Sequence, residues 1–328
     1  MRSMLGCMGF RREDSMKIMI TGGTGFIGSN LAKGLVGKGH EVVAYDLMPT
    51  PARITDVKEK TEVVQGDICN LVKLVETIKA HNVSRIMHLA AYLPEAAIRK
   101  NPTMAVRING EGTNNILEAA RIMNVERVVY ASTDAVNPLG PREGAPCSPT
   151  TLYGHLKRLN EVMGVHFHNQ FGLDTIGLRF GMNYGVRGRL MAGELQREYA
   201  SAIVLDVVEK IAVGSSAVIP FHETTSFHWV YAADNVRAMM LALTCPKTEN
   251  RVFNVCGEEP YTLGDMARVL KTLRPSVDLR FRDVPMPSTL KTAEALTMDC
   301  SAAYEELGYR PEYSFERGLE AYLDHCAG

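Results

Sequence analysis

The sequence predicts an α/β fold in which a parallel sheet is covered by helices on both faces. Short apolar runs alternate with amphipathic segments from residue 17 to about residue 180. These runs are continuously hydrophobic, which is typical of strands that are buried on both faces. A glycine-rich loop separates the first run from the first amphipathic segment, as in doubly wound folds that bind ligands at strand ends.

The elements follow in a regular order. The first strand is expected at residues 18–20, and the glycine-rich loop leads from it into a helix at 30–38. Further strands are expected at residues 41–45, 62–64, 85–89, 127–130 and 174–180, and helices at 71–80, 109–123 and 153–171. Beyond Gly181 the alternation loosens, with helices expected at 195–213, 234–243 and 262–273 and strands at 227–231 and 251–256.

This order predicts two domains. We expect a doubly wound sheet domain over residues 16–181, which residues 228–256 rejoin. A smaller lobe is expected to occupy mainly residues 182–328, and residues 1–15 are expected to form a disordered tail.

Composition excludes several classes of function. The net charge of -1 gives no electrostatic footprint for nucleic acid or an anionic membrane. No apolar run approaches the roughly 20 residues that span a bilayer, so we expect a soluble protein. The seven cysteines are scattered without a CxxC pair, which argues against a disulfide framework or a zinc site and favours the cytoplasm. We therefore expect no metal, no nucleic acid and no membrane as partners.

The glycine-rich loop carries Gly22, Gly25 and Gly28 at GxxGxxG spacing. Bare amides at a helix start hold a pyrophosphate well, and side chains there would block the approach. An ordinary strand-to-helix turn is the alternative, but Asp46 ends the second strand 18 residues after Gly28. Its carboxylate can bond the ribose hydroxyls of NAD and would repel the 2′-phosphate of NADP. Arg53 could in principle accommodate the phosphate of NADP, but it lies well past that strand end and is expected to be solvated in a loop.

A phosphate-binding nucleotidase loop is the other possibility at these glycines. It needs a lysine directly after Gly28, and Ser29 stands there instead. The sequence therefore predicts NAD as the cofactor.

Tyr153 and Lys157 stand four residues apart on one predicted helix face. A nearby ammonium lowers the pKa of a phenol toward neutrality, which creates a proton acceptor for an alcohol. A packed tyrosine beside a solvated lysine would show the same spacing. Ser132 and Thr133 favour the catalytic interpretation, because they end a strand at the edge where the cofactor is expected.

Together these motifs resemble the extended branch of the short-chain dehydrogenase/reductase superfamily, the NAD-dependent epimerases and dehydratases. The resemblance rests on residues 21–28 (TGGTGFIG), 66–68 (GDI), 88–91 (HLAA), Asn109 with 112–114 (GTN), and 153–157 (YGHLK). It implies a Rossmann-type sheet, NAD, and a homodimer. The cofactor-binding residues that it implies are Gly22, Gly25, Phe26, Ile27, Gly28, Asp46, Asp67, Ile68, Leu89, Ala90, Ala91, Asn109, Tyr153 and Lys157.

The resemblance also implies catalytic roles. Tyr153 would be the general acid/base, Lys157 would bond the nicotinamide ribose, and Thr133 with Ser132 would hold the reacting oxygen. The 4,6-dehydratases of the family carry a glutamate after the Ser-Thr-Asp run, and Ala135 occupies that position here. Elimination of water is therefore not expected, although Asp134 remains a candidate acid.

Two further departures concern the substrate. The asparagine and arginine that meet a nucleotide-sugar diphosphate in this family align with Met182 and Phe227, which supply no charge-assisted donor. We therefore expect a smaller carbohydrate-like substrate, with Asp134, Asn183 and Arg187 as candidate contacts. If the loops fold differently, Asn183, Arg187, Arg189, His222 or His228 could supply the missing phosphate donors.

The sequence thus predicts an NAD-dependent oxidoreductase or epimerase that acts on a hydroxyl of a sugar or sugar-derived compound. A UDP-sugar 4-epimerase is the alternative. A non-catalytic NAD-sensing regulator ranks lower, because Tyr153, Lys157 and Thr133 are all present.

Overall fold

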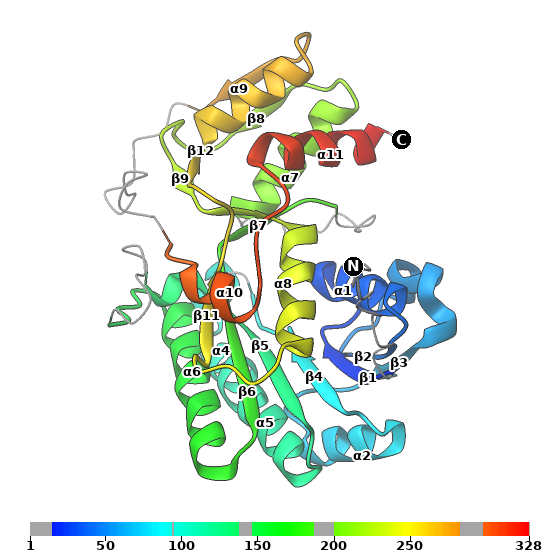
Figure 1. Ribbon diagram of the computed structural model, residues 1–328. Coiled ribbons are helices and arrows are strands. Elements are labelled where there is room, and N and C mark those ends of the chain that lie inside the picture. Colours follow the sequence, from blue (N-terminus) through cyan, green and yellow to red (C-terminus); the bar gives the residue numbers. More distant parts are fainter. Residues whose placement is uncertain (1–14, 94, 138–145, 187–199, 283–297, 328) are drawn as a thin grey trace, which may run out of the picture.

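A seven-stranded parallel sheet forms the centre of the computed structural model, which describes residues 15–93, 95–137, 146–186, 200–282 and 298–327 (Figure 1). The strand order is β11-β6-β5-β4-β1-β2-β3, so the order reverses between β1 and β4. Ligands of such sheets bind at this reversal, beyond the carboxyl ends of the strands. The strands are β1 (Lys17–Thr21), β2 (Glu41–Asp46), β3 (Thr61–Gln65), β4 (Arg85–His88), β5 (Arg127–Thr133), β6 (Asp174–Phe180) and β11 (Val252–Val255). The predicted doubly wound parallel sheet is confirmed.

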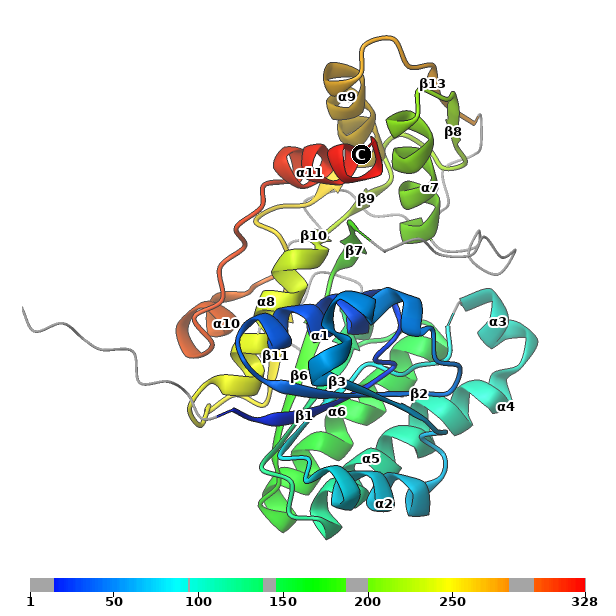
Figure 2. The same ribbon diagram turned by 90° about the vertical axis from the view of Figure 1, so that its right-hand side faces the viewer.

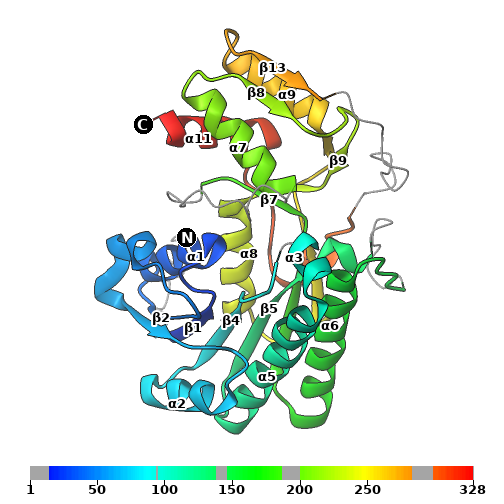
Figure 3. The ribbon, with the colours of Figure 1, turned by 180° about the vertical axis from the view of Figure 1, so that it is seen from behind.

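Helices cover both faces of the sheet, as Figures 1 and 3 show. On one face α1 (Phe26–Gly37) and α8 (Ala232–Thr244) pack against a core that includes Leu31 and Met239. On the other face α2 (Leu71–His81), α5 (Thr113–Ile122) and α6 (Leu152–Phe171) bury a second set of apolar residues. Short helices fill the connections: η1 (Pro51–Lys60), α3 (Glu95–Lys100), α4 (Pro102–Ala105), η2 (Val106–Gly112) and η3 (Asp134–Val136).

Two helices differ from the sequence expectation. The first helix begins at Phe26 rather than residue 30, because the backbone is extended only as far as Gly25 and the chain turns helical directly after it. The helix expected at 109–123 begins earlier, as the π-helix η2, and continues as α5. Such π turns occur frequently at functional sites.

A smaller lobe sits beyond the carboxyl ends of the strands (Figure 2). Its core is aromatic, and Tyr184, Trp229 and Phe315 pack edge-on or tilted against one another. The lobe helices are α7 (Ala200–Ala212), α9 (Leu263–Leu273) and α11 (Phe315–Ala327). Its strands pair as β7 (Met182–Tyr184) with β10 (Trp229–Tyr231), β9 (Ser226–Phe227) with β12 (Tyr261–Thr262), and β8 (Ala217–Ile219) with β13 (Leu279–Phe281).

Late residues of the chain return to the sheet domain. Helix α10 (Ser301–Glu306) and Tyr309 pack into the core beside α8, below the lobe. The predicted tail, residues 1–15, lies outside the described residues except for Ser15. None of the described helices is both long and apolar enough to cross a membrane.

Candidate active site

The glycine loop closes tightly between β1 and α1. Gly22 has a left-handed backbone with φ +67°, and its amide donates to the Tyr45 carbonyl at 2.8 Å. A Cβ on Gly28 would lie 2.2 Å from the Gly22 carbonyl oxygen, so only glycine fits there. Gly25 caps α1 without a side chain, and the first helical turn carries no acidic residue. The helix therefore presents uncompensated amides, which suits a pyrophosphate.

One cavity of about 600 Å³ brings together nearly all the residues expected to bind the cofactor. Its lining includes Gly22, Gly25, Phe26, Ile27, Gly28, Asp46, Asp67, Ile68, Leu89, Ala90 and Ala91. The cavity runs from the glycine loop across the ends of β2 and β4, toward Leu93 and Asn183. Its volume is within the range of small-molecule sites, and the loop, the acidic strand end and the apolar walls fit NAD.

Asp46 is held at the adenosine end of this cavity. Its Oδ2 atom accepts hydrogen bonds from the Thr24 amide at 3.1 Å and the Thr24 hydroxyl at 2.7 Å. Its Oδ1 atom accepts from the Met48 amide at 3.2 Å. The carboxylate is thus fixed in place while it lines the cavity.

The expectation for Arg53 was wrong. Arg53 lines the cavity, and its guanidinium donates to the Thr24 carbonyl at 2.9 Å. The cause is the helix η1, which folds back onto α1 and buries Ile54 in the sheet-domain core.

His88 holds the loop that follows β4. Its Nδ1 atom lies 2.7 Å from the Thr21 hydroxyl and its Nε2 atom 3.1 Å from the Thr113 hydroxyl. Thr113 donates its own proton to the Asn109 carbonyl, so it accepts from Nε2–H, and Nδ1 accepts from Thr21. The Thr21 oxygen in turn accepts from the amides of Leu89 and Ala90, both at 3.2 Å. Burial, and then the charge of Lys157, lower the pKa of His88 to about 3, so this imidazole is neutral.

Asn109 supports the cavity from behind instead of lining it. It lies in the π-helix η2, and its side-chain oxygen accepts from the Tyr92 amide at 2.7 Å. Its side-chain nitrogen donates to the Tyr92 carbonyl at 3.0 Å. This paired contact fixes the backbone of Tyr92, which does line the cavity.

Tyr153 and Lys157 lie together in the first two turns of α6. The helix begins after Thr151, whose hydroxyl accepts from the Gly154 amide at 3.0 Å. The Lys157 ammonium lies 5.7 Å from the Tyr153 ring centroid and donates to the Ala131 carbonyl at 2.7 Å. Tyr153 packs in one apolar cluster with Tyr92, so the pair stands directly beside the cavity.

The electrostatics of this pair differ from the sequence expectation. Burial, with a smaller contribution from Asp134, raises the pKa of the Tyr153 phenol above its usual value. Burial also lowers the pKa of Lys157 to about 8, and the charge of Glu161 opposes that decrease. Burial therefore outweighs any lowering of the phenol's pKa by Lys157, and the role of Tyr153 as proton acceptor stays a prediction.

Thr133 and Ser132 point in different directions, because neighbouring residues of a strand face opposite sides of the sheet. The Thr133 hydroxyl donates to Asp134 at 3.0 Å and accepts from the Ala135 amide at 3.2 Å. The Ser132 hydroxyl donates to the buried carboxylate of Glu161 at 2.7 Å. Thr133 and Asp134 thus lie near Tyr153, whereas the Ser132 hydroxyl points away from Tyr153, toward Glu161. Burial raises the pKa of Asp134.

The expected substrate contacts are only partly described. Asn183 lines the cavity and accepts a hydrogen bond from Asn235. Arg187 lies outside the described residues. Met182 and Phe227 pack against the lobe core, and the Phe227 ring lies 5.2 Å from that of Trp229. Both positions are therefore apolar.

Sequence reasoning missed two groups at this site. Glu161 has a readable signal, since it stands four residues after Lys157 on the same helix face. Thr113 has a weaker one, because nothing in the sequence pairs it with His88 across the fold.

Comparison with known proteins gives consistent results. The model of the NAD dependent epimerase/dehydratase family matches residues 18–256. The chain is 25% identical to UDP-glucuronate 4-epimerase 4 of Arabidopsis thaliana, over 95% of this chain and 75% of that protein.

Two solved structures share the fold. A UDP-glucose 4-epimerase of Thermus thermophilus in complex with NAD has a TM-score of 0.81 at 22% identity, over 95% of this chain and 99% of that one. A partial consensus L-threonine 3-dehydrogenase gives the same TM-score, identity and coverage.

Proposed function

The chain belongs to the NAD dependent epimerase/dehydratase family, and from this premise we propose that it oxidises, or inverts through oxidation, a hydroxyl-bearing carbon of a sugar or sugar-derived compound. One observation carries the proposal. Tyr153, Lys157 and Thr133 are grouped beside a cavity whose glycine loop and acidic strand end fit NAD.

The chemistry divides between cofactor and protein. NAD, when bound, supplies the hydride acceptor and the positive charge of its nicotinamide ring. The glycine loop would hold its pyrophosphate and Asp46 its adenosine ribose. Tyr153 exchanges a proton with the reacting hydroxyl, and its buried phenol is suited to return that proton. Thr133, whose hydroxyl proton points to Asp134, would hold the reacting oxygen by turning that proton toward it, because the proton of the substrate hydroxyl goes to Tyr153. Lys157 adds a positive charge next to the phenol.

We further propose that the sheet domain, residues 16–181 with 228–256, holds NAD and that the lobe holds the substrate. The cofactor-type cavity supports this division, because nearly all its lining comes from the sheet domain and only Asn183 and Leu205 come from the lobe side. The cytoplasmic location stays a prediction.

We propose a small polyhydroxylated substrate without a nucleotide diphosphate. Met182 and Phe227 support this choice, because both pack as apolar side chains in the lobe core and offer no donor. An unpartnered dianion in a closed cleft would cost several kcal/mol. One solved relative is named an L-threonine 3-dehydrogenase, so this fold also serves proteins named for a substrate other than a nucleotide sugar.

A UDP-sugar 4-epimerase is the second candidate, favoured by the names of the relatives with UDP-sugars. The purified protein should be incubated with NAD and with free sugars, sugar acids, polyols and UDP-sugars. NADH absorbance reports net oxidation, and chromatography of the products reports inversion without net NADH.

We expect turnover of a free sugar-type compound and none of UDP-sugars, with Tyr153→Phe as the inactive control. Turnover confined to UDP-sugars, together with thermal protection by UDP, would replace our choice by the second candidate. NAD binding without turnover of any hydroxyl compound would favour a regulator instead.

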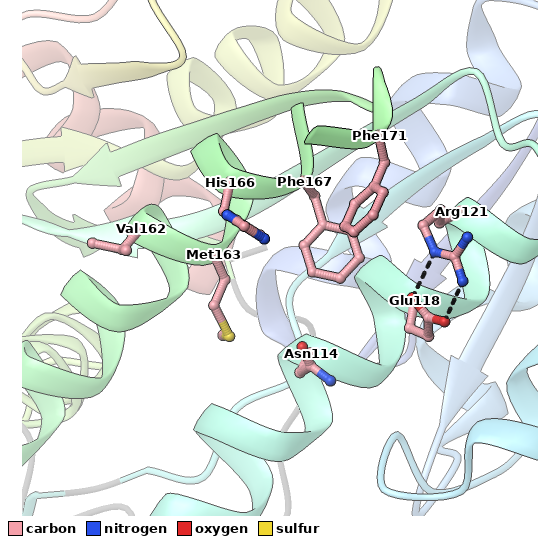
Figure 4. Close-up of a pocket in the computed structure, with 8 residues that line it drawn as sticks. All are labelled: Asn114, Glu118, Arg121, Val162, Met163, His166, Phe167 and Phe171. Atoms are coloured by element: carbon pink, nitrogen blue, oxygen red, sulfur yellow. Dashed lines mark hydrogen bonds and ion pairs between the residues drawn. The ribbon is translucent and has the colours of Figure 1, made fainter. Parts of the chain in front are cut away.

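We also propose that the chain forms a homodimer through the α5/α6 face, which is shown in Figure 4. A surface pocket of about 570 Å³ lies between these helices, with Phe167 and Phe171 on one side and the Glu118–Arg121 ion pair on the other. Beside it Val162 and Phe171 are about half exposed, at 50% and 52%. The exposed apolar side chains between α5 and α6 form a seam. Two copies related by a twofold axis can pack these seams against each other, and the four helices then form a bundle.

The oligomeric state tests this face. The unmodified protein is expected at twice its chain mass of 36.2 kDa in sedimentation equilibrium. Val162→Asp should give the monomer, because it places a charge in the seam. Val213→Asp, at an exposed site in the lobe, should leave the mass unchanged. A monomeric unmodified protein would show that the proposed interface does not form.

A further inference from the structure

Glu161 is a fully buried carboxylate one helical turn beyond Lys157. Its Oε1 atom accepts from the Ser132 hydroxyl and from Arg179 Nε, both at 2.7 Å. Its Oε2 atom accepts from Arg179 Nη2 at 2.7 Å and from Arg158 Nη1 at 3.0 Å. Four donors therefore satisfy this one carboxylate, and they come from β5, β6 and α6.

The cluster stands directly behind the catalytic pair. Tyr153, Lys157 and Glu161 occur at intervals of four residues and so lie along one side of α6. Burial is the main influence on the Lys157 ammonium and lowers its pKa, and the negative charge of Glu161 raises it. Glu161 itself stays ionised, because the hydrogen bonds and the charge of Arg179 hold its pKa below the usual value against the cost of burial.

Other groups face this region from every neighbouring element. His88 at the end of β4 is neutral, and Asp134 lies beyond β5 on the Tyr153 side. Arg179 from β6 and Arg158 from α6 are cations that both pair with Glu161. The ammonium of Lys157 thus has Glu161 as its stabilising anion on the side away from the cavity.

A contribution to stability does not by itself explain why this cluster is charged. Buried ion pairs are often no more stabilising than well-packed apolar residues of similar size, because desolvation consumes the Coulombic gain. A buried charge beneath a functional lysine is explained better by what it does to that lysine.

We propose that Glu161 is a positioning residue for the reaction, which keeps Lys157 charged at the Ala131 carbonyl and fixes the end of β5 through Ser132. This inference rests on the proposed function, in which Lys157 assists Tyr153. It assigns Glu161 no contact with substrate or cofactor.

The test follows the charge state of Lys157 itself. In protein labelled with 13C at the lysine ε carbons, the Lys157 signal is identified by its loss in Lys157→Arg and is titrated with pH. Glu161→Gln should lower the pKa of Lys157, because it removes the anion and leaves Arg179 uncompensated. Arg158→Gln should raise that pKa, because it removes a cation from the cluster. We expect the change in Glu161→Gln to be roughly half a pH unit to one pH unit. The change in Arg158→Gln should be smaller, because that side chain is 42% exposed.

Controls separate charge from structure. The side chain of Arg158 is 42% exposed, so its replacement should fold even if Glu161→Gln does not. Arg280→Gln, at an exposed lobe position, should leave Lys157 unchanged. An unmoved Lys157 pKa in a folded Glu161→Gln would overturn the inference, and if that variant does not fold, an unmoved Lys157 pKa in Arg158→Gln would overturn it.

Activity adds a second readout. The alkaline limb of the kcat/KM profile should move in the same direction as the Lys157 pKa in each variant. The titration needs no substrate. If the Lys157 pKa falls in Glu161→Gln and rises in Arg158→Gln but no compound is turned over, the proposed function is contradicted and the inference is not. Turnover with an unmoved Lys157 would contradict the inference alone.

Discussion

Tyr153→Phe is expected to lower turnover by roughly 100- to 10,000-fold, the range that general acid/base groups contribute. The change removes the phenol oxygen and keeps the ring, which packs with Leu156 and Tyr92. The fold should therefore survive. NAD affinity should also change little, because Tyr153 stands beside the cavity and the described lining does not include it.

The measurement is kcat on the identified substrate, with NAD binding followed by calorimetry. Tyr130→Phe is the matched control, because it removes a buried phenol on β5 that finds no hydrogen-bond partner among the described residues. That variant should keep its activity. Near-normal turnover in Tyr153→Phe would show that another group moves the proton.

The local patterns of the sequence predicted the sheet and the glycine loop of the cofactor cavity, and the family resemblance implied most of the other lining residues. Buried parallel strands are continuous apolar runs, and the tight turn at Gly22 and Gly28 excludes side chains, so the order of the residues reveals both. Asp46 was predictable for a similar reason. Its position at a strand end places it beside the glycine loop in any fold of this topology.

Features that depend on the third dimension were missed. The π-helix η2 differs from an α-helix by a wider turn, which leaves no mark in an amphipathic pattern. Arg53 was expected in solvent because it lies well past the end of β2, yet Ile54 anchors that segment on the core.

One error could have been avoided. Ser132 and Thr133 are consecutive on a strand, so only one of them can face the cofactor edge. The alternation itself excludes a shared role. The spacing of Glu161 after Lys157 could be read, but its contact with Ser132 could not, because the four donors to this carboxylate come from three separate elements.

His88 is expected to make the protein sensitive to acid. In the folded chain its pKa is about 3, whereas an unfolded histidine has a pKa near 6.5. Below pH 6.5 the unfolded chain therefore binds a proton at this histidine that the folded chain does not bind, so acid favours unfolding. The stability linked to this group is fully present above pH 6.5. It falls by about 1.4 kcal/mol per pH unit between the two values, and the loss reaches roughly 5 kcal/mol near pH 3.

Urea unfolding of the unmodified protein and of His88→Gln at several pH values between 7.5 and 5 measures how much of the free energy of unfolding depends on His88. The glutamine keeps a neutral donor toward Thr113 but cannot titrate, so its free energy of unfolding should fall less steeply with acid. The variant should be less stable at pH 7.5, and the gap should narrow as the pH falls. His325→Gln, in the exposed last turn of α11, is the control at a surface site and should follow the unmodified curve. Parallel curves for the unmodified protein and His88→Gln would mean that His88 takes up its proton without unfolding, which the fully bonded neutral imidazole between Thr21 and Thr113 does not allow.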